Sequence, residues 1–168
     1  MTLSLPAPVS DLLPHEGKMR CIDTLVHEEG DSAVAEVTLN PGHALVSNGI
    51  MDRAGFIELA AQTAGARQGY VRKKRNLPPG PGFLVGAQDF VFFTDAYEGD
   101  TLEIFVRLTG EFQGVSVVAA SVRRGGEELA AGKLKVFEPP AEVSAAGAEV
   151  SAAGAKTVAK TFVDGEKG

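Results

Sequence analysis

Residues 51–75 constrain the fold most strongly, because they form a long stretch without proline in which apolar residues recur every three or four positions. Ala54, Ile57, Ala61 and Ala64 show this spacing, which is the pattern of one face of an α-helix. Several of the other residues are strong helix formers. We therefore expect a single long helix from Met51 to Arg75.

This helix carries a carboxylate, Glu58, within its apolar part. Its neighbours Phe56, Ile57 and Leu59 are large and hydrophobic, and the residue one turn further on is Gln62. Side chains four positions apart share a helix face, so Glu58 and Gln62 are expected to form a polar line there. Desolvation disfavours a charged carboxylate among apolar groups, so Glu58 could act as a proton donor. The alternative is a structural acid that is hydrogen-bonded to its neighbours.

Strand-like segments lie on both sides of the helix. Before it, residues 20–27 and 32–40 alternate apolar and polar residues around an EEGD turn, which predicts a hairpin. After it, the run NLPPGPG ends the helix. Short turns then separate four further candidate strands, at residues 83–93, 101–112, 115–124 and 128–137. We expect these four to form an antiparallel meander, with the helix lying across the concave face of the whole sheet.

Two loops complete the expected domain. Residues 1–18 are interpreted as a loop or a short helix around residues 9–13, broken by Pro14 and followed by His15. The segment PGHALVSNG joins the first hairpin to the helix and contains His43. Ser47 or Asn48, at the end of this segment, is expected to cap the helix.

Composition limits the class of protein. The chain has 168 residues, 44% of them hydrophobic, and a net charge of −6, which suits one globular domain and argues against a nucleic-acid binder. We expect that domain to span residues 1–138. Residues 139–168 contain EVSAAGA twice and are expected to be a mobile, low-complexity tail. The sequence predicts neither a membrane span nor a secretory signal, and Cys21 is the single cysteine, so we expect a cytoplasmic protein.

A basic block, defined as Arg72, Lys73, Lys74 and Arg75, lies where the expected helix ends. The helix dipole alone favours cations at this position. The block could also dock an acidic partner.

Two motifs resemble the β-hydroxyacyl-acyl-carrier-protein dehydratases, which have the hot-dog fold. LLPHEGKMRCID (residues 12–23) is similar to their Leu-Pro-His entry, and FIELAAQTAG (residues 56–65) is similar to their Glu-x-x-Ala-Gln helix. His15 together with Met19 is most similar to the dehydratases of aryl-polyene pathways. The resemblance implies an α+β hot-dog fold, with an antiparallel sheet of about six strands wrapped around one central helix.

The resemblance also implies an active site. In that family a loop histidine of one protomer faces the helix carboxylate of the other, and the matching positions here are His43 and Glu58. This implies a homodimer that dehydrates 3-hydroxyacyl thioesters carried on acyl carrier protein. His43 would take a proton from C2 and Glu58 would protonate the departing hydroxyl, a reaction that needs no metal or redox cofactor.

Four further residues are expected to contact the substrate. His15 would shape the mouth of the site, and Gln62 would orient Glu58 from one turn away. Asn48 and Gly49 precede the helix, where backbone N–H groups of residues 49–53 could hold the thioester carbonyl oxygen.

Two other functions stay open at this stage. A thioesterase on the same fold would use Glu58 to activate water or as a nucleophile, and Asn48-Gly49 before the helix is compatible with that class. A non-catalytic hot-dog protein would bind acyl chains or assemble with an active partner. The residues after His43 are Ala44, Leu45 and Val46 where the dehydratases have Phe-Pro-Gly, which is the observation behind this alternative.

Overall fold

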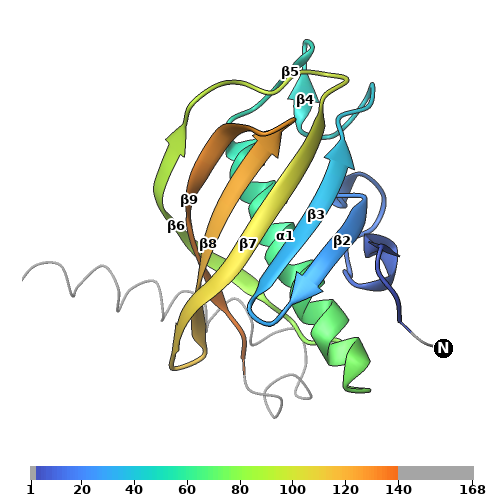
Figure 1. Ribbon diagram of the computed structural model, residues 1–168, viewed down its shortest axis with the longest axis vertical. Coiled ribbons are helices and arrows are strands. Elements are labelled where there is room, and N and C mark those ends of the chain that lie inside the picture. The colour runs from blue at the N-terminus through green and yellow to red at the C-terminus, as the bar shows by residue number, and fades with distance from the viewer. Residues whose placement is uncertain (1–2, 140–168) are drawn as a thin grey trace, which may run out of the picture.

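The computed structural model describes residues 3–139, in which one long helix packs against one face of a curved antiparallel sheet (Figure 1). The helix, α1, spans Ala54–Lys74, close to the expected range. The sheet has seven strands in the order β1-β2-β3-β7-β8-β9-β6. These strands are β1 (Ala7–Pro8), β2 (Thr24–Glu29), β3 (Ser32–Thr38), β6 (Phe83–Phe92), β7 (Thr101–Phe112), β8 (Val115–Arg124) and β9 (Glu127–Phe137).

The expected strands are all present, but their order differs from the prediction in one respect. Strands β7, β8 and β9 form the predicted meander, whereas β6 pairs with β9, from Phe83↔Phe137 to Phe92↔Ala130, and not with β7. Residues 93–100 therefore cross from one edge of the sheet to β7. Alternation along a strand indicates which side chains are buried but not which strand lies next to it, so the sequence did not reveal this crossover.

The core lies between α1 and the inner face of the sheet. Ala33, Ala35 and Val37 alternate along β3 and are almost completely buried, as are the alternate residues of β7 opposite them. On the helix, Phe56 and Leu59 are fully buried. The period of two in the strands and the helical spacing in α1 thus direct both apolar faces to one core.

The N-terminal segment packs on α1 through a close backbone contact. It contains the short 3-10 helices η1 (Val9–Asp11) and η2 (Gly17–Met19). A Cβ atom on Gly69 would overlap the carbonyl oxygen of Leu12, so only glycine lets the segment approach this closely. The segment is therefore held at a fixed position along the helix.

The segment before α1 forms a small hairpin. Strands β4 (Val46–Ser47) and β5 (Ile50–Met51) are joined by Asn48 and Gly49, both at positive φ. The expected cap is wrong: the Asp52 carboxylate, and neither Ser47 nor Asn48, accepts the hydrogen bond from the Ala54 N–H at 2.8 Å. Because Asn48 and Gly49 make the hairpin turn, the chain needs further residues before it can enter the helix.

Residues 140–168, which are the predicted tail except for its first residue, lie outside the described residues. Within residues 3–139, no helix is long and apolar enough to cross a membrane.

Candidate active site

Gln62 organises the polar part of α1. Its side chain is 2% exposed, donates hydrogen bonds to Glu58 Oε1 at 2.7 Å and to the Met19 carbonyl at 2.8 Å, and accepts one from the Cys21 N–H at 2.8 Å. These two backbone partners fix the orientation of the amide, because its oxygen must face the N–H and its nitrogen must face the carbonyl. One oxygen of Glu58 is thereby held in place.

Glu58 lies on the wall of a cavity of about 630 Å³. The wall is formed by one face of α1, by the N-terminal segment and by residues of strands β6, β7, β8 and β9. Glu58 is half-buried, and its second oxygen makes no hydrogen bond among the described residues. His15, Gln62 and Arg67 line the same cavity. The structure therefore brings three of the six predicted site residues, Glu58, Gln62 and His15, to one cavity.

Two nitrogen atoms on this wall are buried without a hydrogen-bond partner within residues 3–139. They are Nδ1 of His15 and Nε of Arg67. The guanidinium of Arg67 is otherwise anchored by the Gly30 carbonyl and by Asp31. Sequence reasoning missed Arg67, because one arginine on a helix gives no signal that it borders a cavity.

His43 does not line this cavity but is joined to it through one peptide unit. Its Nε2 lies 3.2 Å from the Cys21 carbonyl, and its Nδ1 lies 3.3 Å from the Leu45 N–H. Because the Leu45 N–H can only donate, Nδ1 accepts, and the proton of a neutral ring is assigned to Nε2. Cys21 thus bonds to His43 through its carbonyl and to Gln62 through its N–H.

Asn48 and Gly49 lie in the β4–β5 turn and do not line the cavity. Two N–H groups of the region expected to hold a carbonyl oxygen are already used within the chain. The Met51 N–H donates to the Ala96 carbonyl at 2.9 Å, and the Asp52 N–H donates to the Leu45 carbonyl at 3.0 Å. A substrate-binding role for Asn48 and Gly49 stays a prediction.

Charge at the site acts on the Cys21 thiol. Burial raises the pKa of Cys21, the nearby charge of Glu58 raises it further, and a hydrogen bond with Gln62 lowers it. The thiol is 5% exposed and contacts the carbonyls of Lys18 and Met19. Cys21 is therefore a buried, protonated group beside the candidate acid.

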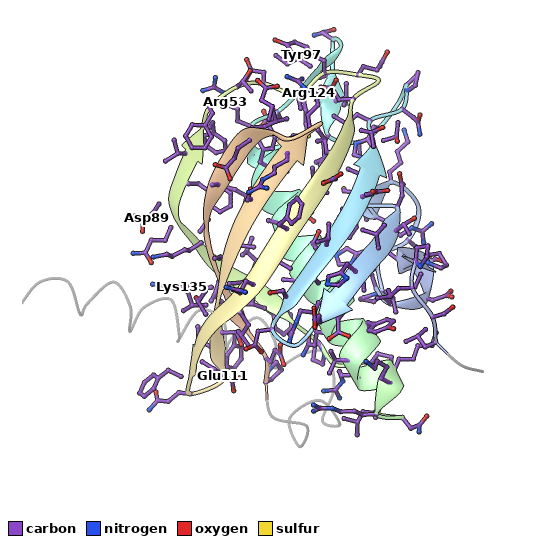
Figure 2. The ribbon with its side chains drawn as sticks, viewed as in Figure 1. Arg53, Asp89, Tyr97, Glu111, Arg124 and Lys135 are labelled. Atoms are coloured by element: carbon purple, nitrogen blue, oxygen red, sulfur yellow. The ribbon has the colours of Figure 1, made fainter. Side chains whose placement is uncertain are left out.

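The lining of the cavity includes a second set of charged groups. Burial raises the pKa of the Glu138 carboxyl, and the charge of Glu111 raises it further, while Arg72 and Arg67 lower it. Glu111 lies at the end of the sheet away from Tyr97 and Arg124 (Figure 2). Within residues 3–139, no group of three or more His, Cys, Asp or Glu side chains could hold a metal ion.

The basic block is partly engaged with the rest of the fold. Arg72 Nε donates to the Pro78 carbonyl at 2.6 Å, and Lys73 Nζ donates to the Asp11 carbonyl at 3.5 Å. Lys74 Nζ pairs with Glu28 at 3.4 Å. These contacts tie the end of α1 to three other segments, so part of the block's role is structural.

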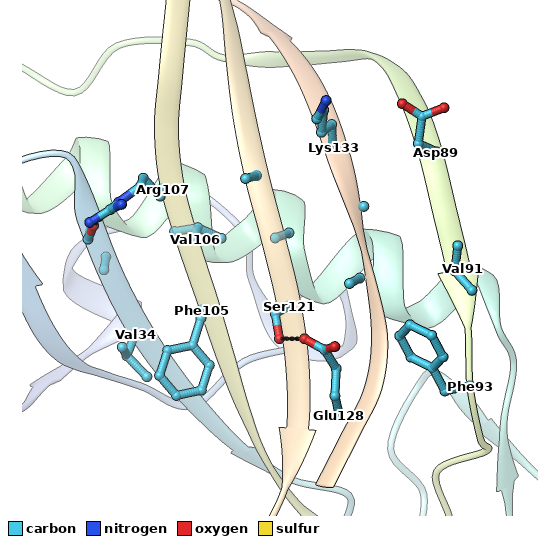
Figure 3. A pocket seen from close by; sticks show the side chains of 16 residues that line it. Val34, Asp89, Val91, Phe93, Phe105, Val106, Arg107, Ser121, Glu128 and Lys133 are labelled. Carbon is cyan, nitrogen blue, oxygen red and sulfur yellow. Dashed lines mark hydrogen bonds between the residues drawn. The ribbon is translucent and has the colours of Figure 1, made fainter. Parts of the chain in front are cut away.

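A second cavity, also of about 630 Å³, lies on the outer face of the sheet, away from α1 (Figure 3). Phe105 and Phe93 stand on its two sides, and Ser121 donates a hydrogen bond to Glu128 at 2.6 Å between them. Neither Glu58 nor any histidine lines it. The inner cavity is therefore the candidate active site.

One helix enclosed by an antiparallel sheet, with a Glu-Gln pair on the helix, defines a protein of the hot-dog class. The chain belongs to the ApeP-like family: the model of this family, described as ApeP dehydratase, matches residues 7–147. This membership makes it a dehydratase, an enzyme of the lyase class. A search of curated proteins found no match.

Solved structures share the fold at low sequence identity. The dehydratase heterocomplex ApeI:P from Xenorhabdus doucetiae matches with a TM-score of 0.74 and 22% identity, covering 81% of this chain and 93% of that chain. A hypothetical thioesterase with coenzyme A from Streptococcus pneumoniae matches with a TM-score of 0.55 and 11% identity, covering 68% and 84%. The protein smu.793 from Streptococcus mutans, bound to acetyl CoA, matches with a TM-score of 0.54 and 17% identity, covering 68% of this chain and 86% of that chain. These matches establish the hot-dog fold.

Proposed function

We propose that the protein removes water from 3-hydroxyacyl thioesters carried on acyl carrier protein, giving the enoyl product. The observation that carries this proposal is the Glu58 carboxylate, which Gln62 holds by one oxygen on the wall of a cavity of about 630 Å³. That volume lies within the range of small-molecule sites. Membership of a dehydratase family gives the reaction class.

In the proposed reaction Glu58 is the acid and His43 is the base. The base takes a proton from C2, the C2–H electrons form the C2=C3 double bond, and the C3–O bond breaks as Glu58 protonates the departing hydroxyl. Water and the enoyl thioester leave, and the proton returns from the base to Glu58. To accept a proton, the His43 ring has to release the Leu45 N–H from Nδ1, because Nε2 already carries the proton that it donates to the Cys21 carbonyl.

The proposed site includes a second chain, because the family resemblance places the histidine and the carboxylate in different protomers. An unpaired strand edge supports this assembly. Strand β6 is the last strand of the sheet, so the backbone groups on its outer side have no partner strand within residues 3–139. Leu84, Val91 and Phe93, on or next to β6, are 43%, 50% and 57% exposed. The partner is proposed to be a second copy, and the ApeI:P heterocomplex makes an unlike hot-dog chain the alternative.

Acyl carrier protein is the proposed source of the substrate, and the basic block is its proposed docking surface. Carrier proteins are strongly acidic, so cations near the cavity would attract them. Arg72 and Arg75 line the cavity. Among the described residues the side chain of Arg75 has no hydrogen bond or ion pair, which leaves its guanidinium available to a partner.

Incubating the protein with a 3-hydroxyacyl thioester tests the proposal. A rise in enoyl absorbance supports dehydration. Release of free thiol would instead favour the thioesterase alternative, in which the open oxygen of Glu58 activates water. Binding without either product would identify a non-catalytic acyl-binding protein.

A further inference from the structure

His15 lines the candidate site from the N-terminal segment, and this segment contacts α1 on both sides of the residue. On its N-terminal side, the Leu12 carbonyl contacts the helix at Gly69. On its C-terminal side, Gln62 binds the Met19 carbonyl and the Cys21 N–H. The segment that carries His15 is thus attached to the same helix as Glu58, and both residues line the same cavity.

Neither ring nitrogen of His15 has a partner within residues 3–139, but the two nitrogens differ in burial. Nδ1 is fully buried, whereas Nε2 is not among the buried atoms that lack a partner and makes no hydrogen bond there. A buried N–H without an acceptor is rarer and less tolerable than a buried acceptor without a donor. The neutral ring is therefore assigned its proton on Nε2, so that an unused N–H donor is left at the open side of the ring.

The dehydration step needs such a donor. When C2 loses its proton, negative charge develops on the thioester carbonyl oxygen, and a positioned hydrogen-bond donor stabilises that charge. The backbone at the start of α1 offers little of it, because five of the six N–H groups of residues 51–56 already have acceptors within the chain. These five belong to Met51, Asp52, Ala54, Gly55 and Phe56, and among the described residues the Arg53 N–H has no acceptor.

We infer that Nε2–H of His15 donates a hydrogen bond to the carbonyl oxygen of the substrate thioester, in the cavity where Glu58 protonates the departing hydroxyl. This inference rests on the proposed dehydration. His15 and Glu58 act on different substrate atoms. The carbonyl oxygen and the 3-hydroxyl are separated by three carbon atoms, so each requires its own protein partner. In this role His15 gives up no proton.

Two variants and one control separate this role from a structural one. His15→Leu removes the donor and keeps an apolar side chain of similar size. His15→Gln keeps an N–H near the position of Nε2. His27→Leu is the control, because His27 is an exposed histidine of β2 that pairs with Glu29 at 3.7 Å, outside the cavity.

The direct readout is the infrared carbonyl band of a bound saturated acyl pantetheine thioester, labelled with ¹³C at the carbonyl carbon. This ligand cannot react. The band should move to lower frequency on binding to the wild type and to His27→Leu, move less with His15→Gln, and stay at its solution position with His15→Leu. With a 3-hydroxyacyl substrate, kcat should fall about 10²- to 10³-fold in His15→Leu, and KM should change much less.

An equal band shift in the wild type and in His15→Leu would overturn the inference, as would a kcat within threefold of the wild type in that variant. If His15→Leu fails to fold, a band in His15→Gln that stays at its solution position would also overturn it. A wild type that shifts the band but forms no enoyl product would remove the proposed function. Enoyl formation without any band shift would remove only the role of His15.

Discussion

At the scale of single residues, the site depends on one amide. Gln62 is buried and uses both ends of its side chain: its nitrogen donates to Glu58 and Met19, and its oxygen accepts from Cys21. Removing the amide would leave the buried Cys21 N–H without a partner, and the Met19 carbonyl would keep only its long contact with the Cys21 thiol at 3.6 Å. Each such group costs about 1–3 kcal/mol, whereas the contact with Glu58 alone would be worth less.

Gln62→Met tests this reading, because methionine fills a similar volume without hydrogen-bonding groups of the same kind. We expect the free energy of unfolding to fall by about 2–3 kcal/mol, measured by urea denaturation. Gln68→Met is the matched control, since Gln68 lines the same cavity from α1 but its side chain makes no hydrogen bond in the described part of the chain. Its effect should stay within about 0.5 kcal/mol. Equal losses in the two variants would show that the amide contacts contribute little.

The Cys21 thiol reports the charge of Glu58. Burial raises the pKa of Cys21 and the Glu58 carboxylate raises it further. Glu58→Gln removes the second cause, so the pKa should fall, more thiolate should be present at pH 8, and alkylation by iodoacetamide should become faster. Glu16→Gln, in the same N-terminal segment, should leave the rate unchanged. An unchanged rate in Glu58→Gln would mean that the carboxylate does not act on the thiol.

The sequence predicted the pair of side chains Glu58 and Gln62 on the helix, but it did not indicate which other groups bind them. Spacing alone placed Glu58 and Gln62 on one face, and they do touch. The groups that hold Gln62 are backbone atoms of Met19 and Cys21, which no residue type signals. The two hydrogen bonds of the His43 ring were equally invisible, because they too join side chain to backbone.

At the scale of elements, glycines set how closely the N-terminal segment approaches α1. A Cβ atom on Gly65 would lie 3.1 Å from a side-chain carbon of Leu13, and a small side-chain movement could relieve this contact. Gly69 faces the Leu12 backbone. A shift of that backbone would also displace the side chains of Leu12 and Leu13 and the residues that follow them. Leu12 and Leu13 are 8% and 9% exposed, so their displacement would uncover apolar surface.

Gly69→Ala sets two effects against each other. Alanine is a better helix former than glycine by about 1 kcal/mol, which alone would stabilise α1. The overlap with Leu12 should outweigh this gain, so we expect a net loss of about 2 kcal/mol and a fall in dehydration rate as His15 moves from Glu58. Gly110→Ala in β7 is the control, because nothing lies within 4 Å of its Cβ position. A stabilised and fully active Gly69→Ala protein would show that the segment is not fixed by this contact.

The elements themselves followed from the sequence with small errors in their bounds. The helix expected over residues 51–75 spans Ala54–Lys74, because Asn48 and Gly49 turn a hairpin that delays its start. The short strand β1 was missed, since Ala7–Pro8 is too brief to show alternation. The position of β6 beside β9 depends on pairing between distant segments, which local patterns do not encode.

At the scale of the whole molecule, the sheet has one long edge without a partner strand within residues 3–139. Edge β6 carries exposed apolar side chains, and exposed edges of this kind either aggregate or pair with another chain. Pairing through β6 would extend the sheet from one protomer into the next.

Val91→Lys tests this assembly, because a charge on β6 should oppose pairing with another strand. We expect the wild type to sediment as a dimer in analytical ultracentrifugation and Val91→Lys to shift toward the monomer. Tyr97→Lys is the control, since Tyr97 is similarly exposed, at 48% against 50% for Val91, but lies outside β6. The β6 interface would be excluded by a Val91→Lys protein that keeps the mass of the wild type.

The central claim is that the Glu58 carboxyl group protonates the departing hydroxyl of a 3-hydroxyacyl thioester. The most direct measurement compares the rate of enoyl formation by the wild type with that of Glu58→Gln, which keeps the size of the side chain but cannot supply the proton. We predict a fall in kcat of about 10²- to 10⁴-fold, with the fold intact by circular dichroism. A Glu58→Gln protein that forms the enoyl product at the wild-type rate would contradict the account.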